Sequence, residues 1–205
     1  MTDRRPGLRE RKNERTQRAI IEATLRLTLE QGFETTTIAA IAEQAEVASR
    51  TVFAWFACKD DIVLGGLGED VQRLQEALAT GEGDVVDRIE AWLDAEGRFV
   101  RDVGELRRLR YRAVTTDPYL RSRARALWDD AEETIAAALA RDLGQSADGI
   151  GPRAFAAAVM GVLVGLRRLY LTEPDPSEAA EQLEAGLAFL RGGVAALGHA
   201  RDRAR

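Results

Sequence analysis

The chain has 205 residues, of which 45% are hydrophobic and 31% are charged, and its net charge is -5. No unbroken apolar run reaches about 18 residues and no apolar signal segment opens the chain, so we expect neither a membrane protein nor an exported one. One cysteine and one histidine exclude an intrachain disulfide and a histidine-based metal set. We therefore expect a cytoplasmic protein without a metal or cofactor.

The residues that usually carry catalysis are scarce. His199 lies in a tail rich in glycine, alanine and arginine. No glycine-rich phosphate loop or serine elbow lies between a strand and a helix. We therefore expect no enzyme and assign no catalytic residue. A small helical enzyme that uses carboxylates alone is the alternative.

Apolar residues recur at helical spacing, and no segment has a convincing strand pattern. The predicted fold class is therefore all-α. Gly32 favours the end of the first helix, Thr37 offers the second an N-cap, and the Gly/Asp-rich segment 81–84 is the clearest break. The expected helices are Glu10–Gln31, Ile38–Ala45, Ser49–Trp55, Lys59–Ala79, Val85–Val103, Glu105–Thr115, Pro118–Leu143, Pro152–Leu171 and Ser177–Leu197.

The two short helices predicted at 38–45 and 49–55 form a helix-turn-helix candidate because only a few residues connect them. Their apolar residues can close a small core. These residues are Ile38, Ile41, Ala42, Val47, Val52 and Phe56. Ser49, Arg50 and Ala54 then lie on the outer face of the second helix, which fits the major groove of DNA.

The segment from Gly32 to Lys59 resembles the DNA-binding signature of TetR-type transcriptional regulators, and the match covers roughly residues 14–63. The matching residues are Gly32, Phe33, Thr37, Ile41, Ala42, Ala45, Val47, Thr51, Phe53, Phe56 and Lys59. The resemblance implies that residues 1–58 form an N-terminal arm and a three-helix DNA-binding domain. Residues 59–205 would form a helical effector-binding and dimerisation domain.

Two groups of residues are expected to contact DNA. Arg50 can donate two hydrogen bonds to guanine, worth about 1–3 kcal/mol of discrimination, while Ser49 and Thr51 are short donors or acceptors. The family's motif implies a second group that grips the DNA backbone. This group consists of Thr37, Phe53, Trp55 and Lys59. Packing against the first helix is the alternative for the two aromatic residues.

The turn of the motif departs from the family pattern. Glu46 replaces the usual glycine, so the expected left-handed turn residue is missing. Ala48 replaces the usual N-cap serine, and we expect Ser49 to cap the helix instead. Phe53 also lacks the hydroxyl of the usual tyrosine. These changes predict modest DNA affinity.

Charge is distributed unevenly along the sequence. Residues 1–18 carry seven basic and three acidic side chains, whereas residues 61–205 sum to -6. A basic arm beside a helix-turn-helix favours steering toward DNA. The arm at residues 2–9 is expected either to reach a minor groove or to be a solvated tail.

The last two predicted helices favour dimerisation. Ala157, Gly161 and Gly165 recur every four residues and would let two backbones approach closely. In the final helix an apolar stripe lies beside Gly186 and Gly193. The stripe consists of Leu183, Leu187, Leu190, Val194 and Leu197. Repeated by two-fold symmetry, both helices would form a four-helix interface like that of TetR-type dimers, and an intrachain core is the alternative.

Nine arginines and three acidic residues lie between residues 98 and 125. Arg110 falls on the buried stripe of its predicted helix and needs an anion, either a local carboxylate such as Asp129 or a ligand. The predicted effector-binding residues are Trp92, Phe99, Arg110, Tyr111, Trp128 and Tyr170. The region 106–128 also resembles mycofactocin-type TetR regulators, and this resemblance implies an anionic amphipathic effector such as an acyl-CoA.

The sequence therefore predicts a homodimeric, ligand-responsive transcriptional repressor. It would bind a palindromic operator and be released by a small-molecule effector. Its partners would be double-stranded DNA, a second copy of itself and the effector. The alternatives are the helical enzyme without DNA binding and a constitutive DNA-architectural protein without an effector pocket.

Overall fold

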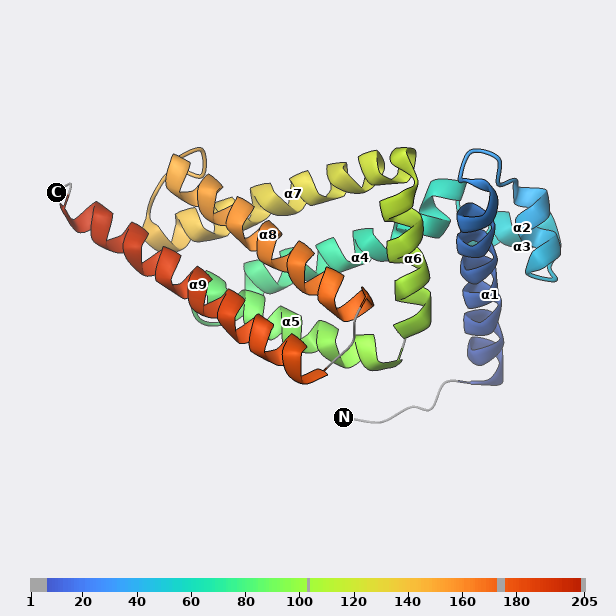
Figure 1. Cartoon of the computed structure of the whole chain (residues 1–205), viewed down its shortest axis with the longest axis horizontal. Coiled ribbons are helices and arrows are strands. Elements are labelled where there is room, and N and C mark those ends of the chain that lie inside the picture. Colours follow the sequence, from blue (N-terminus) through green and yellow to red (C-terminus); the bar gives the residue numbers. More distant parts are fainter. Residues whose placement is uncertain (1–6, 103, 173–175, 204–205) are drawn as a thin grey trace. The chain divides into compact units, whose positions relative to one another are not determined.

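The computed structural model describes residues 7–102, 104–172 and 176–203. It leaves undescribed the side chains of Leu8, Glu10, 96–102, 170–172, 176–180 and 200–203. Its helices are α1 (Leu8–Gln31), α2 (Ile38–Gln44), α3 (Ser49–Trp55), α4 (Lys59–Thr80), α5 (Val85–Asp102), α6 (Gly104–Thr116), α7 (Pro118–Leu143), α8 (Ile150–Thr172) and α9 (Pro176–Arg203) (Figure 1). The described ranges contain no strand. The all-α prediction is confirmed, and each expected helix is present.

Local chemistry sets the ends of several helices. Gly32 follows α1 with a φ of +89°, the left-handed conformation that glycine adopts without steric cost. Thr37 is the N-cap of α2, and its hydroxyl accepts a hydrogen bond from the Ala40 amide at 3.2 Å. Pro152 lies in the first turn of α8, where a missing N–H is tolerated. That helix therefore begins two residues earlier than predicted.

The chain divides into two compact units. The first unit comprises Met1–Gly66 and Glu105–Ala124, and the second comprises Leu67–Gly104 and Arg125–Arg205. The first unit thus contains α6 and the beginning of α7 as well as the predicted DNA-binding segment. The helix α4 begins in the first unit and ends in the second. A domain boundary after residue 58 stays a prediction.

The first unit is built around a small apolar cluster from four helices. The buried residues of this cluster are Ile20, Ile41, Ala42, Val52 and Ile62. Half-buried Ile38, Val47 and Phe56 pack against it, so the core predicted from the sequence is present. On α1, Arg26 also forms an ion pair with Glu105 at the start of α6, at 3.3 Å.

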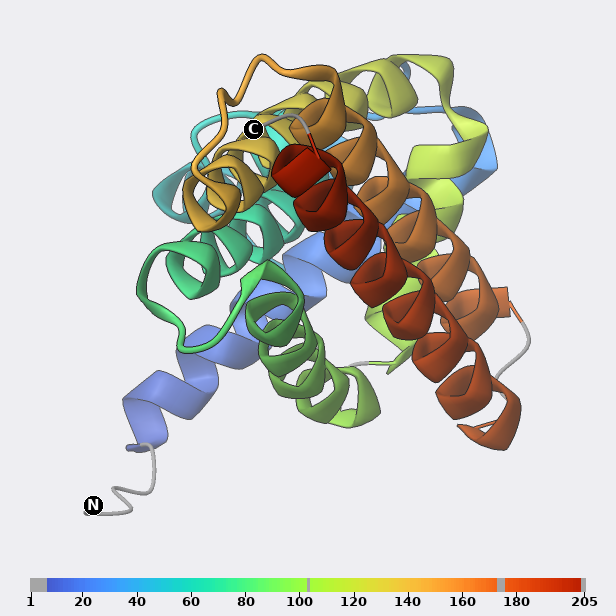
Figure 2. The same ribbon diagram turned by 90° about the vertical axis from the view of Figure 1, so that its left-hand side faces the viewer.

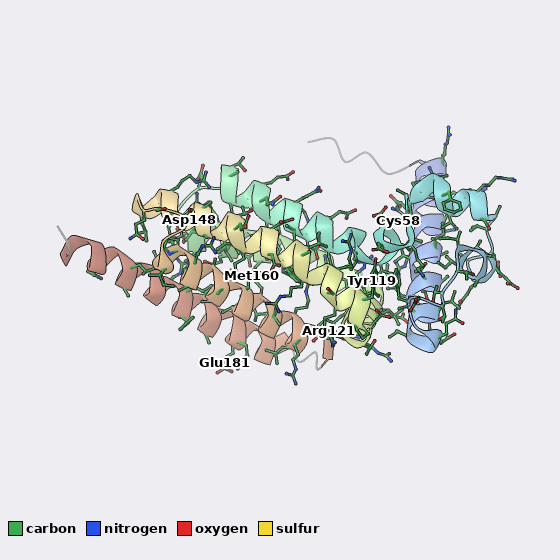
Figure 3. The ribbon with its side chains drawn as sticks, turned by 90° about the horizontal axis from the view of Figure 1, so that it is seen from above. Cys58, Tyr119, Arg121, Asp148, Met160 and Glu181 are labelled. Carbon is green, nitrogen blue, oxygen red and sulfur yellow. The ribbon has the colours of Figure 1, made fainter. Side chains whose placement is uncertain are left out.

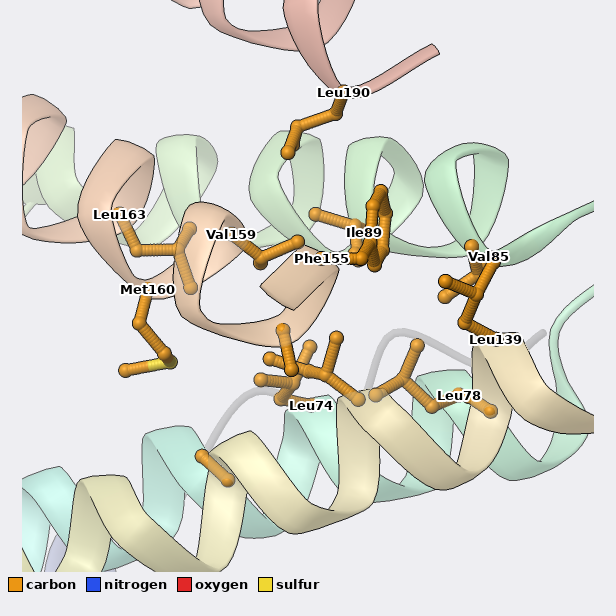
Figure 4. Packing of buried hydrophobic residues seen from close by; sticks show 14 of the residues in the cluster. Leu74, Leu78, Val85, Ile89, Leu139, Phe155, Val159, Met160, Leu163 and Leu190 are labelled. Carbon is orange, nitrogen blue, oxygen red and sulfur yellow. The ribbon is translucent and has the colours of Figure 1, made fainter. Parts of the chain in front are cut away.

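The second unit has a larger core, drawn in part in Figure 4. Its nineteen buried residues come from α4, α5, α7, α8 and α9. Phe155 and Val159 of α8 lie close to Leu190 of α9 in this core, and the two helices run side by side (Figure 2). The predicted leucine stripe of α9 also belongs here, because Leu187 and Leu190 are buried and the other three residues pack against the cluster.

The first half of α4 carries three glycines, Gly65, Gly66 and Gly68. A Cβ atom at Gly65 or Gly68 would meet nothing within 4 Å. A Cβ atom at Gly66 would instead collide with the guanidinium group of Arg110 on α6. Among the described residues, Gly66 is therefore the one of these three glycines that packs closely against another side chain, the flexible end of Arg110.

One helix in the described part of the chain is long and apolar enough to cross a membrane by length and composition, namely α8 over Ile150–Leu169. The criterion of an unbroken apolar run does not identify this segment, because a few arginines interrupt it. The core helix of a water-soluble protein has the same properties. Phe155, Val159 and Leu163 place one face of α8 in the core of the second unit.

Candidate nucleic-acid interface

The turn between α2 and α3 contains a left-handed residue that is not glycine. Glu46 has a φ of +54°. The Val47 amide donates to the Ala42 carbonyl at 2.9 Å and the Glu46 amide to the Glu43 carbonyl at 3.1 Å. These two bonds form a Schellman motif, which normally has glycine at this position. The prediction that the turn lacks a left-handed residue is therefore wrong, because Glu46 adopts this conformation itself. The cost is about 1–2 kcal/mol for a side chain with a Cβ atom.

The N-terminus of α3 has no side-chain cap. Ala48 occupies the N-cap position with extended backbone angles, φ -74° and ψ 147°. Ser49 is already the first residue of the helix. The prediction that Ser49 caps α3 is therefore wrong, because Ser49 lies inside the helix and no side chain makes a cap hydrogen bond at this end.

The short helix α3 buries one side and exposes the other. Val52 is buried in the core of the first unit, and Thr51 is half-buried. The exposed residues are Ser49, Arg50, Phe53, Ala54 and Trp55. Phe53 is 60% exposed and Trp55 is 38% exposed. The aromatic ring of Phe53 is thus available to a partner and is not held in the core.

Thr37 and Lys59 already have partners within the first unit. The hydroxyl of Thr37 caps α2. The ammonium group of Lys59 donates to the carbonyl groups of Phe33, Glu34 and Thr36, the last at 2.8 Å, and it lies 4.2 Å from the centre of the Phe33 ring. Burial lowers the pKa of Lys59. Contact of these two side chains with DNA stays a prediction.

Sequence reasoning did not identify a polar clamp that joins the start of α7 to the loop after α1. One carboxylate oxygen of Asp117 accepts a hydrogen bond from the Phe33 amide at 3.1 Å, and the other caps α7 through the Leu120 amide. The Tyr119 ring stacks on Phe33 with 5.5 Å between ring centres. The only sequence signal was the Asp-Pro pair at 117–118, which predicts a helix start and not its long-range partner.

The same clamp reaches the start of α4. The Tyr119 hydroxyl donates to the Asp60 carboxylate at 2.8 Å, which raises the pKa of Tyr119. Arg123 also pairs with Asp60, at 3.4 Å. Figure 3 shows Tyr119 beside the start of α4, close to Cys58. The clamp thus holds the start of α4, the helix that follows α3 along the chain.

The predicted effector residues do not all lie in one unit. Trp92 is buried in the core of the second unit, and half-buried Trp128 packs against the same core. Arg110 and Tyr111 are half-buried residues of α6 in the first unit. The side chains of Phe99 and Tyr170 lie outside those that the structure describes. The structure therefore brings together the two tryptophans of this set.

Each of these tryptophans has one notable polar feature. The indole nitrogen of Trp92 is buried and has no hydrogen-bond partner among the described residues. The guanidinium group of Arg167 lies 4.7 Å from the centre of the Trp128 ring, in contact distance for a cation-π interaction. Arg167 also pairs with Asp70, a buried carboxylate of α4, at 3.4 Å.

A separate open groove of about 820 Å³ lies on the second unit. The residues that line it are Gln75, Asp129, Asp130, Glu132, Glu133, Thr134, Ala136, Ala137, Ala147, Asp148 and Arg153. Figure 3 labels Asp148, in the loop between α7 and α8. The groove contains five carboxylates and none of the predicted effector residues. Its negative charge is opposite to what the binding of the predicted anionic effector would need.

Two protein families match most of the chain. Residues 20–65 match the family of bacterial regulatory proteins named after TetR, and residues 84–195, more than half of the chain, match the family described as the MftR C-terminal domain. The chain belongs to the TetR family of transcriptional regulators. The predicted resemblance is confirmed in both parts, and residues 20–65 of this TetR-family chain form its DNA-binding helix-turn-helix region.

Individual relatives agree with this assignment. Over 104 residues the TetR-family chain is 40% identical to the HTH-type transcriptional regulator TcmR of Streptomyces glaucescens. The aligned part covers 49% of this chain and 45% of TcmR, so less than half of that relative is matched.

Solved structures share the fold at lower identity. SmeT in complex with triclosan is 21% identical, with a TM-score of 0.63 over 85% of this chain and 89% of SmeT. NalD, the secondary repressor of the MexAB-OprM multidrug efflux pump in Pseudomonas aeruginosa, is 23% identical. Its TM-score is 0.59 over 86% of this chain and 96% of NalD.

Proposed function

We propose that this TetR-family chain is a ligand-responsive repressor that binds a palindromic operator as a homodimer and is released by a small-molecule effector. The observation that supports operator binding is the exposed face of α3. There Arg50 and Ser49 present hydrogen-bonding groups to solvent, while Val52 anchors the helix in the core. Such a helix can enter a major groove without unfolding.

Arg50→Ala tests this assignment directly. We expect the variant to bind a set of operator point variants with nearly equal affinities, because the guanine contact that distinguishes them is lost. Fluorescence anisotropy at fixed salt measures these affinities. Arg153→Ala is the matched control, since Arg153 is an exposed arginine of the second unit and its loss changes the net charge equally. Unchanged relative affinities in Arg50→Ala would refute the base-reading role.

Homodimerisation is supported by an exposed apolar face of α8 and α9. The exposed residues of α8 include Ala154, Ala157, Gly161, Val164 and Gly165, and those of α9 include Ala185, Ala188, Phe189, Gly192 and Ala195. Val164 is 54% exposed and Phe189 is 65% exposed. A face of this kind is typical of a surface that a second copy covers by two-fold symmetry.

The glycines on these helices support the same interface. A Cβ atom at Gly161, Gly165 or Gly192 would meet nothing within 4 Å. A Cβ atom at Gly186 would instead lie 2.7 Å from a methyl group of Val162. Packing within the chain therefore explains Gly186, whereas the open positions allow the backbone of a partner helix to approach. The interface would use this exposed face and not the leucine stripe of α9.

The proposed effector is an anionic amphipathic molecule such as a long-chain acyl-CoA. The core of the second unit offers an apolar environment, and the buried indole N–H of Trp92 would gain a hydrogen bond from a ligand carbonyl. Arg167 beside Trp128 supplies a positive charge within the same unit. Arg110 of α6 belongs to the first unit and stays a predicted effector residue.

Ligand titration against the operator complex tests the effector class. We expect palmitoyl-CoA to release the protein and to quench the emission of Trp92, and we expect Trp92→Phe and Arg110→Ala to weaken release. Trp55→Phe is the control for the emission change, since Trp55 lies in the first unit. Release by lipophilic cations alone would overturn the proposal and would direct attention to the acidic groove.

A further inference from the structure

The exposed face of α3 combines one arginine with apolar side chains. Residues three and four apart on a helix are neighbours, so Arg50 lies next to both Phe53 and Ala54. All three residues are exposed. None of the ion pairs among the described residues involves Arg50. The guanidinium group and its apolar neighbours thus form one continuous surface.

The apolar part of this face is not used by the fold. Phe53 belongs neither to the buried cluster of the first unit nor to the half-buried residues that pack on it. Ala54 is exposed on the same face. A phenyl ring and a methyl group cannot donate or accept hydrogen bonds. Their partner in a major groove must therefore be apolar.

The major groove has one apolar group that depends on sequence, the 5-methyl group of thymine. Arg50 pairs best with guanine, which presents two acceptors in the same groove. Arg50 and Ala54 are four residues apart, about 6 Å along the helix axis, and successive base pairs are about 3.4 Å apart. A thymine that touches Ala54 or Phe53 is thus expected within about two base pairs of the guanine.

We propose that each operator half-site contains a guanine read by Arg50 and, within two base pairs of it, a thymine whose 5-methyl group packs against Ala54 and Phe53. This inference rests on the proposed function as an operator-binding dimer. It assigns Phe53 to the base edge and not to the phosphate backbone, which fits a ring without a hydroxyl group. The recognition helix then specifies part of its operator by apolar contact.

The test removes only the methyl group from the DNA. An operator is first selected from random sequences, and each thymine of the half-site is then replaced symmetrically by deoxyuridine. For the wild-type protein we expect one thymine position at which the Kd rises roughly fourfold per half-site, the effect of losing one buried methyl group. Deoxyuridine outside the half-sites is the control and should change the Kd less than twofold.

Two protein variants connect this effect to its residues. In Ala54→Gly and in Phe53→Ala the penalty for deoxyuridine should fall, to less than twofold in at least one of them, because the apolar partner of the methyl group is gone. Since a glycine near the end of α3 can also loosen the helix, Ala54→Ser provides a second variant of similar size. Circular dichroism checks that all variants are folded.

The outcomes separate this inference from the proposed function. A selected operator that lacks thymine beside the guanine, or that tolerates every deoxyuridine, would overturn the inference while leaving operator binding intact. A methyl effect of unchanged size in all three variants would also overturn it, because another residue would then make the contact. If no sequence is selected, the proposed function itself fails.

Discussion

Different interactions stabilise the interior of each of the two compact units of this TetR-family chain. In the first unit, five buried apolar residues join α1, α2, α3 and the start of α4, and polar contacts made by Lys59, Asp117 and Tyr119 fix the surrounding loops. In the second unit, nineteen buried residues from five helices form one apolar core. Single polar groups should therefore matter most in the first unit, and apolar surface should matter most in the second.

The largest expected effect concerns the exposed apolar face of the second unit. Gly161→Leu should prevent close approach of a second copy and give monomers. Operator affinity should then fall about 100-fold or more, because the second half-site is no longer bound by a linked partner. Sedimentation velocity and operator titration measure both effects. Ala79→Leu on α4 adds the same side chain at another exposed site and is the control. A Gly161→Leu protein that sediments as the wild-type dimer would contradict the interface.

The next effect tests the dependence of the first unit on one ammonium group. Lys59→Met keeps the length of the side chain but removes the donor to three carbonyl groups. We expect the free energy of unfolding to fall by about 1–3 kcal/mol, the usual cost of leaving buried polar groups unsatisfied. Denaturation followed by Trp55 emission in a Trp92→Phe, Trp128→Phe background measures this in the first unit.

Lys12→Met is the matched control for Lys59, since it removes the other lysine of the chain from an exposed position on α1. Equal stability of the two variants would show that the carbonyl contacts contribute little. The salt dependence of operator binding supplies a separate readout. If the Lys59 ammonium also contacts a phosphate, its loss reduces the slope of log K against log salt by about one.

A smaller effect is expected in the turn before α3, where the first unit has two unfavourable residues. Glu46→Gly should relieve the left-handed strain, and Ala48→Ser should add an N-cap hydroxyl, with a gain of about 1 kcal/mol each. Thermal unfolding should therefore shift to higher temperature. Glu43→Gly, inside α2, is the control and should destabilise by about 1 kcal/mol. A lower melting temperature for Glu46→Gly would mean that the glutamate side chain makes a compensating interaction.

The smallest effect concerns a single ionisation in the polar clamp. The Asp60 carboxylate raises the pKa of Tyr119, so the neutral phenol is favoured in the folded protein. This contribution to stability is present below the ordinary tyrosine pKa of about 10 and is lost as the pH rises through the raised value. Asp60→Asn should lower the pKa of Tyr119. Phenolate absorbance in a Tyr111→Phe, Tyr170→Phe background measures it, with Asp61→Asn as the control. Identical titration curves would exclude the coupling.

Local signals in the sequence predicted most of the fold. Gly32, the hydroxyl of Thr37 and the Asp117-Pro118 pair act within one helix turn of themselves, so their consequences can be predicted without knowing the tertiary structure. The core of the helix-turn-helix followed from spacing and from the family resemblance. The second carboxylate oxygen of Asp117 shows the limit. Its partner, the Phe33 amide, lies 84 residues away, and no local pattern specifies that pairing.

The candidate sites were predicted less evenly. The exposure of Arg50 followed from the period of α3, whereas the exposure of Phe53 was one of two alternatives, because an aromatic ring at that spacing suits a core and a binding face equally well. On α9 the leucine stripe resembled an interface but packs within the chain. An apolar stripe indicates that a helix face is covered, but it does not indicate whether the same chain or a second copy covers it. The exposed face of α8 and α9 is instead distinguished by glycines that have no side-chain neighbours.

The glycines at positions 65 and 68 should make the backbone hydrogen bonds in the first half of α4 easier to break than those in the second half. Neither is required by packing, and each weakens a helix by about 1 kcal/mol relative to alanine. They flank the point between Gly66 and Leu67 at which the two units meet along the chain. Backbone amides of this stretch should therefore exchange with deuterium faster than those near Leu74 and Leu78, which are buried in the core. The helix that joins the two units along the chain would then open transiently around residues 65–68.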